Sequence, residues 1–192
     1  MYVVIEGVDK SGKTTLCDCL SIHFGEFGED VLFYKIKEPS MLRKPRMWGL
    51  QGQKSRETAA LWFAHDRMRN YNLISSAKNS PLLLISDRSK FSSFAYQGMD
   101  ILNYNIIINK NIPDPDIIIF LKADLDEIEE NLDPEDEFED KAFLERVQQN
   151  YLGPIRQYCL RNDIKFKCFE ARSDSITNEV IVYLRKELEM SL

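Results

Sequence analysis

Short apolar runs alternate along the chain with longer stretches whose apolar residues have helical spacing. The runs predict five strands, at Tyr2–Glu6, Val31–Ile36, Pro81–Arg88, Pro113–Asp124 and Lys165–Ala171. Continuous apolar runs of this length are typical of parallel strands buried on both faces. We therefore expect these five segments to form the central sheet of the protein.

Helical periodicity fills the intervals between these runs. Leu16, Leu20 and Phe24 lie at i, i+4 and i+8, which predicts a helix from about Lys13. Further helices are predicted over Arg56–Ser76, Lys141–Leu160 and Ser175–Glu189. This alternation predicts an α/β fold with a five-stranded parallel sheet flanked by helices, in which ligands bind at the carboxyl ends of the strands.

Length and composition are those of an ordinary globular protein. A chain of 192 residues, 44% hydrophobic and 29% charged, suits a single domain spanning residues 1–192. Its apolar runs are too short to cross a bilayer, and the start of the chain lacks the features of a signal peptide. We therefore expect a cytoplasmic protein with no membrane partner.

The charge is unevenly distributed. The net charge is −6, which argues against a general nucleic-acid partner. Eleven acids and no Lys or Arg lie in the segment Asp124–Asp140, while bases outnumber acids in the rest of the chain. That remainder suits an anionic small-molecule substrate. The acidic segment is predicted to be either a solvated helix and loop or a lid with a functional role.

Cysteine and histidine do not suggest a metal site. The two histidines and four cysteines lack the spacing of zinc ligands. We expect the thiols to be reduced and mostly buried, at Cys17, Cys19, Cys159 and Cys168.

The first strand runs into the segment GVDKSGKTT, which fits the phosphate-loop pattern GxxxxGK[ST] between a strand and a helix. Successive backbone N–H groups of such a loop bind phosphate, helped by the helix N-terminus. Lys13 is expected to reach the β and γ phosphates, and the Thr14 hydroxyl to bind Mg²⁺. The predicted ATP-binding residues here are Gly7, Asp9, Lys10, Ser11, Gly12, Lys13, Thr14 and Thr15.

A second motif, SDRSKFSSFAYQG, follows the third predicted strand. Together with the phosphate loop, it resembles the signatures of thymidylate kinases, which are P-loop nucleoside monophosphate kinases. "KEPS" after the second strand, a Phe-x-x-x-Arg in the long helix, and "PDIIIFL" in the fourth strand agree with this family. The resemblance extends from Met1 to about Ala171 and implies a three-layer P-loop NTPase fold with a lid at about residues 124–140.

The resemblance implies transfer of the γ-phosphoryl group of ATP to dTMP with Mg²⁺, in dTTP biosynthesis. Arg88 would grip the dTMP phosphate, and Asp87 would help to hold Mg²⁺ through water. Asp9 would accept a hydrogen bond from the sugar 3′-hydroxyl. Glu38 would approach the acceptor and the metal, although an exposed loop acid is an alternative. Ala171 is also expected among the ATP-binding residues.

The resemblance also implies a pocket for the thymine base and its sugar. Phe63 would stack on the base and Arg67, one helical turn away, would bond its O4. The alternatives are a core aromatic residue for Phe63 and a surface ion pair for Arg67. Ser92, Tyr96 and Gln97 would line the base and sugar pocket, although Tyr96 could equally belong to the core.

The chain departs from the family pattern in two respects. Ser89 occupies a position that usually holds a large ring, which crowds out a 2′-hydroxyl, so its small side chain predicts weaker rejection of ribonucleotides. The lid arginines of many bacterial members are absent from residues 124–140, and Asn131 lies near where an arginine often stacks on adenine. Lys10 instead fits the pattern of another subgroup of the family, whose members have a basic residue in the phosphate loop. We expect Lys10 to stabilise the transition state.

Three functions are compatible with these features. Thymidylate kinase is the first expectation, and the family implies a homodimer. The alternative is a nucleoside monophosphate kinase of broader or shifted specificity, using dUMP or ribonucleotide acceptors. The third is a nucleotide-binding protein that has lost catalysis. This alternative is disfavoured because the motif residues are intact, namely Lys13, Thr14, Asp87 and Arg88.

Overall fold

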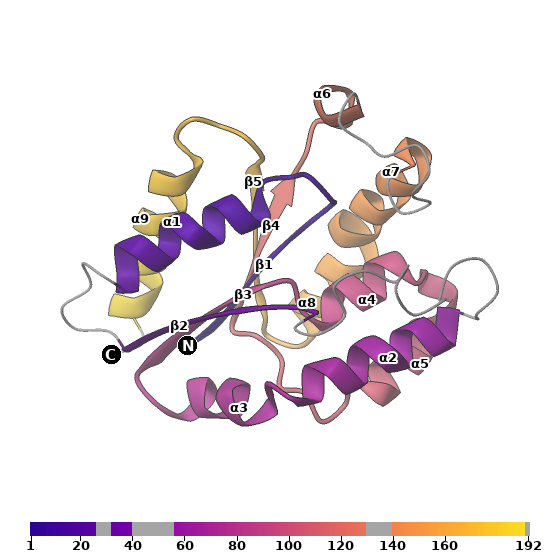
Figure 1. Cartoon of the computed structure of the whole chain (residues 1–192), viewed down its shortest axis with the longest axis horizontal. Coiled ribbons are helices and arrows are strands. Elements are labelled where there is room, and N and C mark those ends of the chain that lie inside the picture. The colour runs from indigo at the N-terminus through magenta and orange to yellow at the C-terminus, as the bar shows by residue number, and fades with distance from the viewer. Residues whose placement is uncertain (26–31, 40–55, 130–139, 191–192) are drawn as a thin grey trace.

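A five-stranded parallel sheet forms the centre of the protein in a computed structural model, which describes residues 1–25, 32–39, 56–129 and 140–190 (Figure 1). The strand order is β2-β3-β1-β4-β5, so β1 is central and β2 and β5 are the edges. The strands are β1 (Tyr2–Gly7), β2 (Leu32–Lys37), β3 (Leu82–Asp87), β4 (Ile117–Lys122) and β5 (Lys165–Glu170). All five strand predictions and the predicted fold class are confirmed.

Alternating side chains divide the core into two layers. Every residue of β1 is buried. Val3 and Ile5 face the layer formed by α1 (Lys13–Gly25) and α9 (Ile176–Glu189), where Leu20 and Leu184 are fully buried. Figure 1 shows α1 and α9 together on this side of the sheet. The apolar face of each helix, spaced at i and i+4, is thereby removed from water.

The opposite face of the sheet is covered by helices from the middle and the end of the chain. Tyr2 and Val4 pack there with residues of α3, α4, α7 and α8. Helix α2 lies against α5 and α4. The elements of this layer are α2 (Arg56–Met68), α3 (Tyr71–Asn79), α4 (Lys90–Tyr96), the 3₁₀ turn η2 (Met99–Ile101), α5 (Leu102–Ile108), α6 (Leu125–Glu129), α7 (Lys141–Asn150), the π-helical turn η4 (Tyr151–Ile155) and α8 (Arg156–Arg161).

The predicted long helices are more divided than expected. The stretch predicted as one helix over Arg56–Ser76 breaks between α2 and α3, where the N–H of Asn70 bonds the carbonyl of Arg67 at 3.0 Å in an i to i+3 turn. The stretch over Lys141–Leu160 passes through the π-helical turn, which contains Pro154. Proline lacks the N–H that a regular α-helical turn would use, and this accounts for the irregularity. The short helices α4 and α5 were not predicted.

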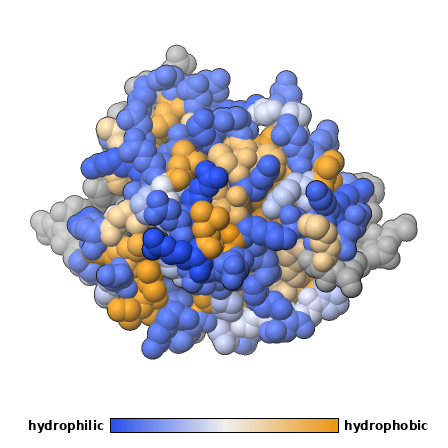
Figure 2. All heavy atoms as spheres, turned by 180° about the vertical axis from the view of Figure 1, so that it is seen from behind, coloured by the Kyte–Doolittle hydropathy of each residue, from blue (hydrophilic) through white to orange (hydrophobic). Residues whose placement is uncertain are grey.

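Hydrophilic side chains predominate on the face shown in Figure 2, and apolar ones form separate groups between them. Scattered apolar surface of this kind is normal for folded proteins. Among the described residues, no helix has the length and apolar character needed to cross a membrane. The four cysteines are free, as predicted, but only Cys17 and Cys159 are buried.

Candidate functional site

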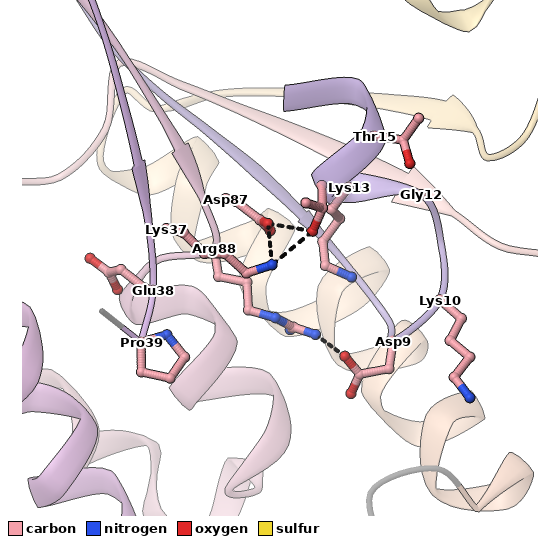
Figure 3. A pocket seen from close by; sticks show the side chains of 11 residues that line it. Asp9, Lys10, Gly12, Lys13, Thr15, Lys37, Glu38, Pro39, Asp87 and Arg88 are labelled. Atoms are coloured by element: carbon pink, nitrogen blue, oxygen red, sulfur yellow. Dashed lines mark hydrogen bonds and ion pairs between the residues drawn. The ribbon is translucent and has the colours of Figure 1, made fainter. Parts of the chain in front are cut away.

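A cleft of about 410 Å³ opens at the carboxyl ends of β1, β2 and β3. This is the edge at which ligands of parallel α/β sheets bind. Figure 3 shows the lining residues, which come from the loop after β1, the start of α1 and the ends of β2 and β3, with Lys37 beside Asp87 and Arg88 beside Asp9. The lining residues are Asp9, Lys10, Gly12, Lys13, Thr14, Thr15, Lys37, Glu38, Pro39, Asp87 and Arg88.

The loop after β1 has a backbone that requires glycine. A Cβ on Gly7 would lie 2.7 Å from the Ser11 hydroxyl and 2.8 Å from the carbonyl oxygen of Leu121. Gly12 has a φ of +86° with open space where a side chain would stand. Because Gly7 and Gly12 have no side chains, the loop backbone can lie close to the sheet while its outer side stays open to a ligand. A phosphate-binding loop requires both.

Lys13 is buried at the start of α1. Its ammonium donates to the carbonyl of Val8 and lies 3.3 Å from the Ser11 hydroxyl. Burial, together with the nearby Arg88 guanidinium, lowers the pKa of Lys13 to about 7. A phosphate group placed in this loop would favour the charged ammonium. The loop is therefore poised to gain a charge-assisted contact when an anion binds.

Thr14 and Asp87 meet where β1 and β3 end. The Thr14 hydroxyl donates to the Asp87 carboxylate at 2.6 Å, and Asp87 is buried. Their hard oxygen atoms suit Mg²⁺, which typically takes one or two protein ligands and completes its shell with water and substrate phosphates. The described residues contain no cluster of three or more acidic, His or Cys side chains that could bind a metal alone. The pair fits a magnesium ion that arrives with a phosphate.

Arg88 lies beside Asp9 from the phosphate loop. A guanidinium nitrogen of Arg88 donates to Asp9, and the guanidinium carbon lies 5.1 Å from the ring centre of Tyr96. The Tyr96 hydroxyl donates to the other Asp9 oxygen at 3.2 Å. Burial alone would raise the pKa of Asp9, but Arg88 and Lys13 outweigh it and hold that pKa below its ordinary value. The acid in this loop therefore orients the cation of the second motif.

Glu6, which was not predicted as a site residue, binds side chains that lie next to Arg88. It is fully buried, and one carboxylate oxygen accepts from the Ser89 hydroxyl at 2.6 Å. The other accepts from Ser92 and from Tyr151, each at 2.7 Å. These bonds join β1, the start of α4 and the π-helical turn. A charged residue inside a buried apolar run is the sequence signal that could have marked it, although its partners could not be predicted.

Ser89 is turned into the protein. Besides its bond to Glu6, its hydroxyl accepts from the N–H of Phe91 at 3.2 Å and so caps α4. The side chain is buried and is not among the residues that line the cleft. The weaker rejection of ribonucleotides predicted from its small size stays a prediction, and this geometry does not place its side chain at the cleft.

Glu38 and Arg67 form a buried ion pair. Nε of Arg67 donates to Glu38 at 2.5 Å, and both side chains are less than 5% exposed. The alternatives of an exposed loop acid and a surface ion pair are therefore wrong. Burial raises the pKa of Glu38, and Arg67 offsets only part of that shift. The second carboxylate oxygen of Glu38 lacks a hydrogen-bond partner among the described residues, and Glu38 lines the cleft.

Arg67 makes most of its bonds inside the protein. Its terminal nitrogens donate to the Asn109 side chain at 2.6 Å and to the Ser89 carbonyl at 3.1 Å. The fourth contact reaches the Ser93 hydroxyl at 3.3 Å. Within the described contacts, one N–H of the guanidinium has no partner, but Arg67 is not among the residues that line the cleft.

The other residues predicted for the base pocket are less closely grouped. Phe63 is half-buried on α2. The Ser92 hydroxyl lies 3.4 Å from a guanidinium nitrogen of Arg88. Gln97 is buried at the end of α4, and its side-chain oxygen has no partner among the described residues. Tyr96 is half-buried and packs against the core as well as contacting Asp9.

Residues of the donor side are also placed by the structure. Lys10 has a φ of +62°, and Figure 3 shows its side chain directed away from that of Lys13. The Lys10 carbonyl accepts from Arg172 at 3.2 Å, which ties the loop after β5 to the phosphate loop. Ala171 continues the sheet pairing through its N–H, 2.8 Å from the Lys122 carbonyl. Asn131 and residues 130–139 of the predicted lid lie outside the described residues.

Known proteins are similar to this chain in sequence and in fold. A family model described as "Thymidylate kinase" matches residues 5–174. Proteins named "Probable thymidylate kinase" from Methanosphaera stadtmanae and Methanocaldococcus jannaschii are 34% and 31% identical. The first comparison covers 96% of this chain and 100% of the relative, and the second 96% of each.

Two solved thymidylate kinase structures have a similar fold. The structure from Candida albicans has a TM-score of 0.73 at 23% identity, covering 96% of this chain and 91% of that one. The structure from Ehrlichia chaffeensis has a TM-score of 0.68 at 22% identity, covering 96% of this chain and 98% of that one. With the family model and the archaeal relatives, they confirm the resemblance drawn from the two motifs: the chain belongs to the thymidylate kinase family.

Proposed function

We propose that this chain transfers the γ-phosphoryl group of ATP to dTMP, giving ADP and dTDP, with Mg²⁺ as the metal cofactor. The observation that carries the proposal is the meeting of two cationic phosphate sites in one cleft. Lys13 lies in the loop after β1, and Arg88 lies after β3. The pairing of β1 with β3 sets these two cations at adjacent strand ends, which supports binding of a donor and an acceptor phosphate side by side.

The chain's contribution is positioning and charge neutralisation. Phosphoryl transfer needs little covalent help, because the acceptor phosphate is already ionised. Lys13 and the loop N–H groups bind the donor phosphates, while Arg88 binds the acceptor phosphate as a bidentate cation. Thr14 and Asp87 would hold Mg²⁺, Asp87 through water, and the bound ion would neutralise charge on the phosphate oxygens. Fixed cations in a buried site stabilise the developing charge without rearranging during the reaction.

The roles on the acceptor side follow from the family resemblance. Asp9 binds the sugar 3′-hydroxyl while it orients Arg88, and Glu38 approaches the acceptor and the metal. Phe63 stacks on the base and the remaining N–H of Arg67 bonds the base O4. Ser92, Tyr96 and Gln97 line the sugar and base pocket. The homodimer and the cytoplasmic location expected from the sequence stay predictions.

Base selectivity tests this function. A carbonyl at the 4-position can accept from Arg67, whereas the amino group of cytosine leaves that buried N–H unpaired. We expect kcat/KM to fall in the order dTMP > dUMP ≫ dCMP when ADP release is measured with a panel of monophosphates. Equal use of dCMP would contradict the Arg67 assignment, efficient use of ribonucleotides would indicate the broader kinase, and no turnover would indicate a binding protein.

Lys10 is proposed to contact the transferring phosphoryl group in the transition state. Lys10→Ala should lower kcat by about 10²–10³ with little change in either KM, because a contact made mainly in the transition state affects kcat. Lys10→Arg, the matched control, should keep substantial activity since it keeps the charge. A near-normal kcat for Lys10→Ala would shift the assignment to Arg43, Lys44 or Arg46, which lie outside the described residues.

Lys13 should take up a proton when nucleotide binds. Its pKa of about 7 leaves it mostly neutral at pH 8, and the phosphates of ATP raise that pKa by favouring the ammonium. Calorimetric titration with Mg·ATP at pH 8, in buffers of different ionisation enthalpy, should show uptake of up to about one proton per nucleotide. At pH 6 Lys13 is already charged, so this uptake should vanish. Absence of uptake at pH 8 would show that Lys13 is charged before nucleotide binds.

A further inference from the structure

Lys37 contributes a cation to the cleft that the sequence motifs did not identify. It is the last residue of β2 and is paired in register with Asp87 at the end of β3. Its ammonium lies 2.9 Å from the Thr14 hydroxyl and 3.2 Å from the Asp87 carboxylate. The Thr14 hydroxyl itself donates to Asp87, so the three groups contact one another, and Figure 3 shows Lys37 beside Asp87.

This position coincides with the proposed metal ligands. Thr14 and Asp87 are the two side chains assigned to Mg²⁺, and the ammonium contacts both. A buried carboxylate needs a compensating cation, and Asp87 is only 3% exposed. In the nucleotide-free protein, Lys37 supplies part of that compensation. The ammonium and a magnesium ion cannot occupy the same place between these oxygens.

The Lys37 side chain is also able to move away from Thr14 and Asp87. Its side chain is 59% exposed, and β2 is an edge strand, so the flexible stem can turn toward solvent without disturbing the core. Lys35, two residues earlier on the same strand, makes a different contact, since its ammonium pairs with Asp18 on the surface of α1. The two lysines therefore differ in partner while sharing a strand.

From this geometry we infer that Lys37 is a stand-in for Mg²⁺: it neutralises metal-free ATP at the Thr14–Asp87 pair and is displaced when Mg²⁺ arrives with the nucleotide. The inference rests on the proposed nucleotide site but not on the identity of the acceptor. Metal-free ATP carries negative charge that no metal neutralises, and Lys37 is a cation that lines the same cleft as Lys13 and Thr14. Lys37 thereby reduces the dependence of nucleotide binding on Mg²⁺.

Calorimetric binding of ATP to the intact protein, without acceptor, tests this role. The Kd is measured in EDTA and again in excess Mg²⁺, for the wild type and for Lys37→Met. Loss of a charge-assisted contact should weaken metal-free binding about tenfold. Binding of Mg·ATP should stay within about threefold, because Lys37 is displaced in that complex. The ratio of the two Kd values should therefore widen at least about threefold, and about tenfold if Mg·ATP binding is unchanged.

Two controls separate this role from general effects. Lys35→Met removes the same charge from the same strand and should leave the ratio unchanged, whereas Lys37→Arg should preserve much of the metal-free binding. An unchanged ratio in Lys37→Met, or an equal change in Lys35→Met, would overturn the inference while leaving the proposed kinase intact. Failure of the wild type to bind ATP under either condition would instead refute the proposed nucleotide site on which the inference rests.

Discussion

The parallel pairing of β1 with β3 is the constraint on which the site depends. It sets Ile5 opposite Asp87, and the N–H of Arg88 bonds the Ile5 carbonyl at 3.0 Å. The phosphate loop and the second motif, about eighty residues apart, therefore leave the sheet side by side. A one-residue slip in register would send each strand's side chains to the opposite face. Two buried core layers oppose such a slip, so the core fixes the spacing of the site.

Charge compensation is the second organising feature. Before any ligand binds, each central cation of the cleft already contacts oxygen acceptors of the protein. Lys13 contacts a backbone carbonyl, Arg88 contacts Asp9, and Lys37 contacts Asp87. Desolvated charges without such partners would be costly. These contacts hold the three cations in place at the cleft before any anionic ligand binds.

The sequence was sufficient to predict the strands of the sheet and those candidate site residues that lie next to a glycine or within a motif. Continuous apolar runs identified the five strands, and the loop pattern identified Lys13 and Thr14. Glu6 and Lys37 were missed because their roles depend on partners more than 20 residues away in the sequence, which local patterns do not reveal. The breaks after α2 and after α7 were also missed, since hydrophobic periodicity continues through a short turn.

The buried state of Arg67 illustrates the same limit. Its helical spacing from Phe63 suggested a shared face, but the contacts that bury it come from Glu38, directly after β2, and Asn109, directly after α5. Likewise, the size of Ser89 suggested open space, whereas its hydroxyl caps α4 and bonds Glu6. Side-chain size can be read from sequence, but side-chain direction is set by the tertiary structure.

We propose that donor and acceptor phosphates meet in one cleft between Lys13 and Arg88. The adjacency of these two sites can be tested by the Kd of a compound in which adenosine and thymidine are joined through their 5′ positions by a chain of phosphates. If both sites are adjacent, the compound should bind at least about 100-fold tighter than ATP, because the second half binds at high effective concentration. Arg88→Met should abolish most of this gain. A compound that binds wild-type protein no tighter than ATP would contradict the account.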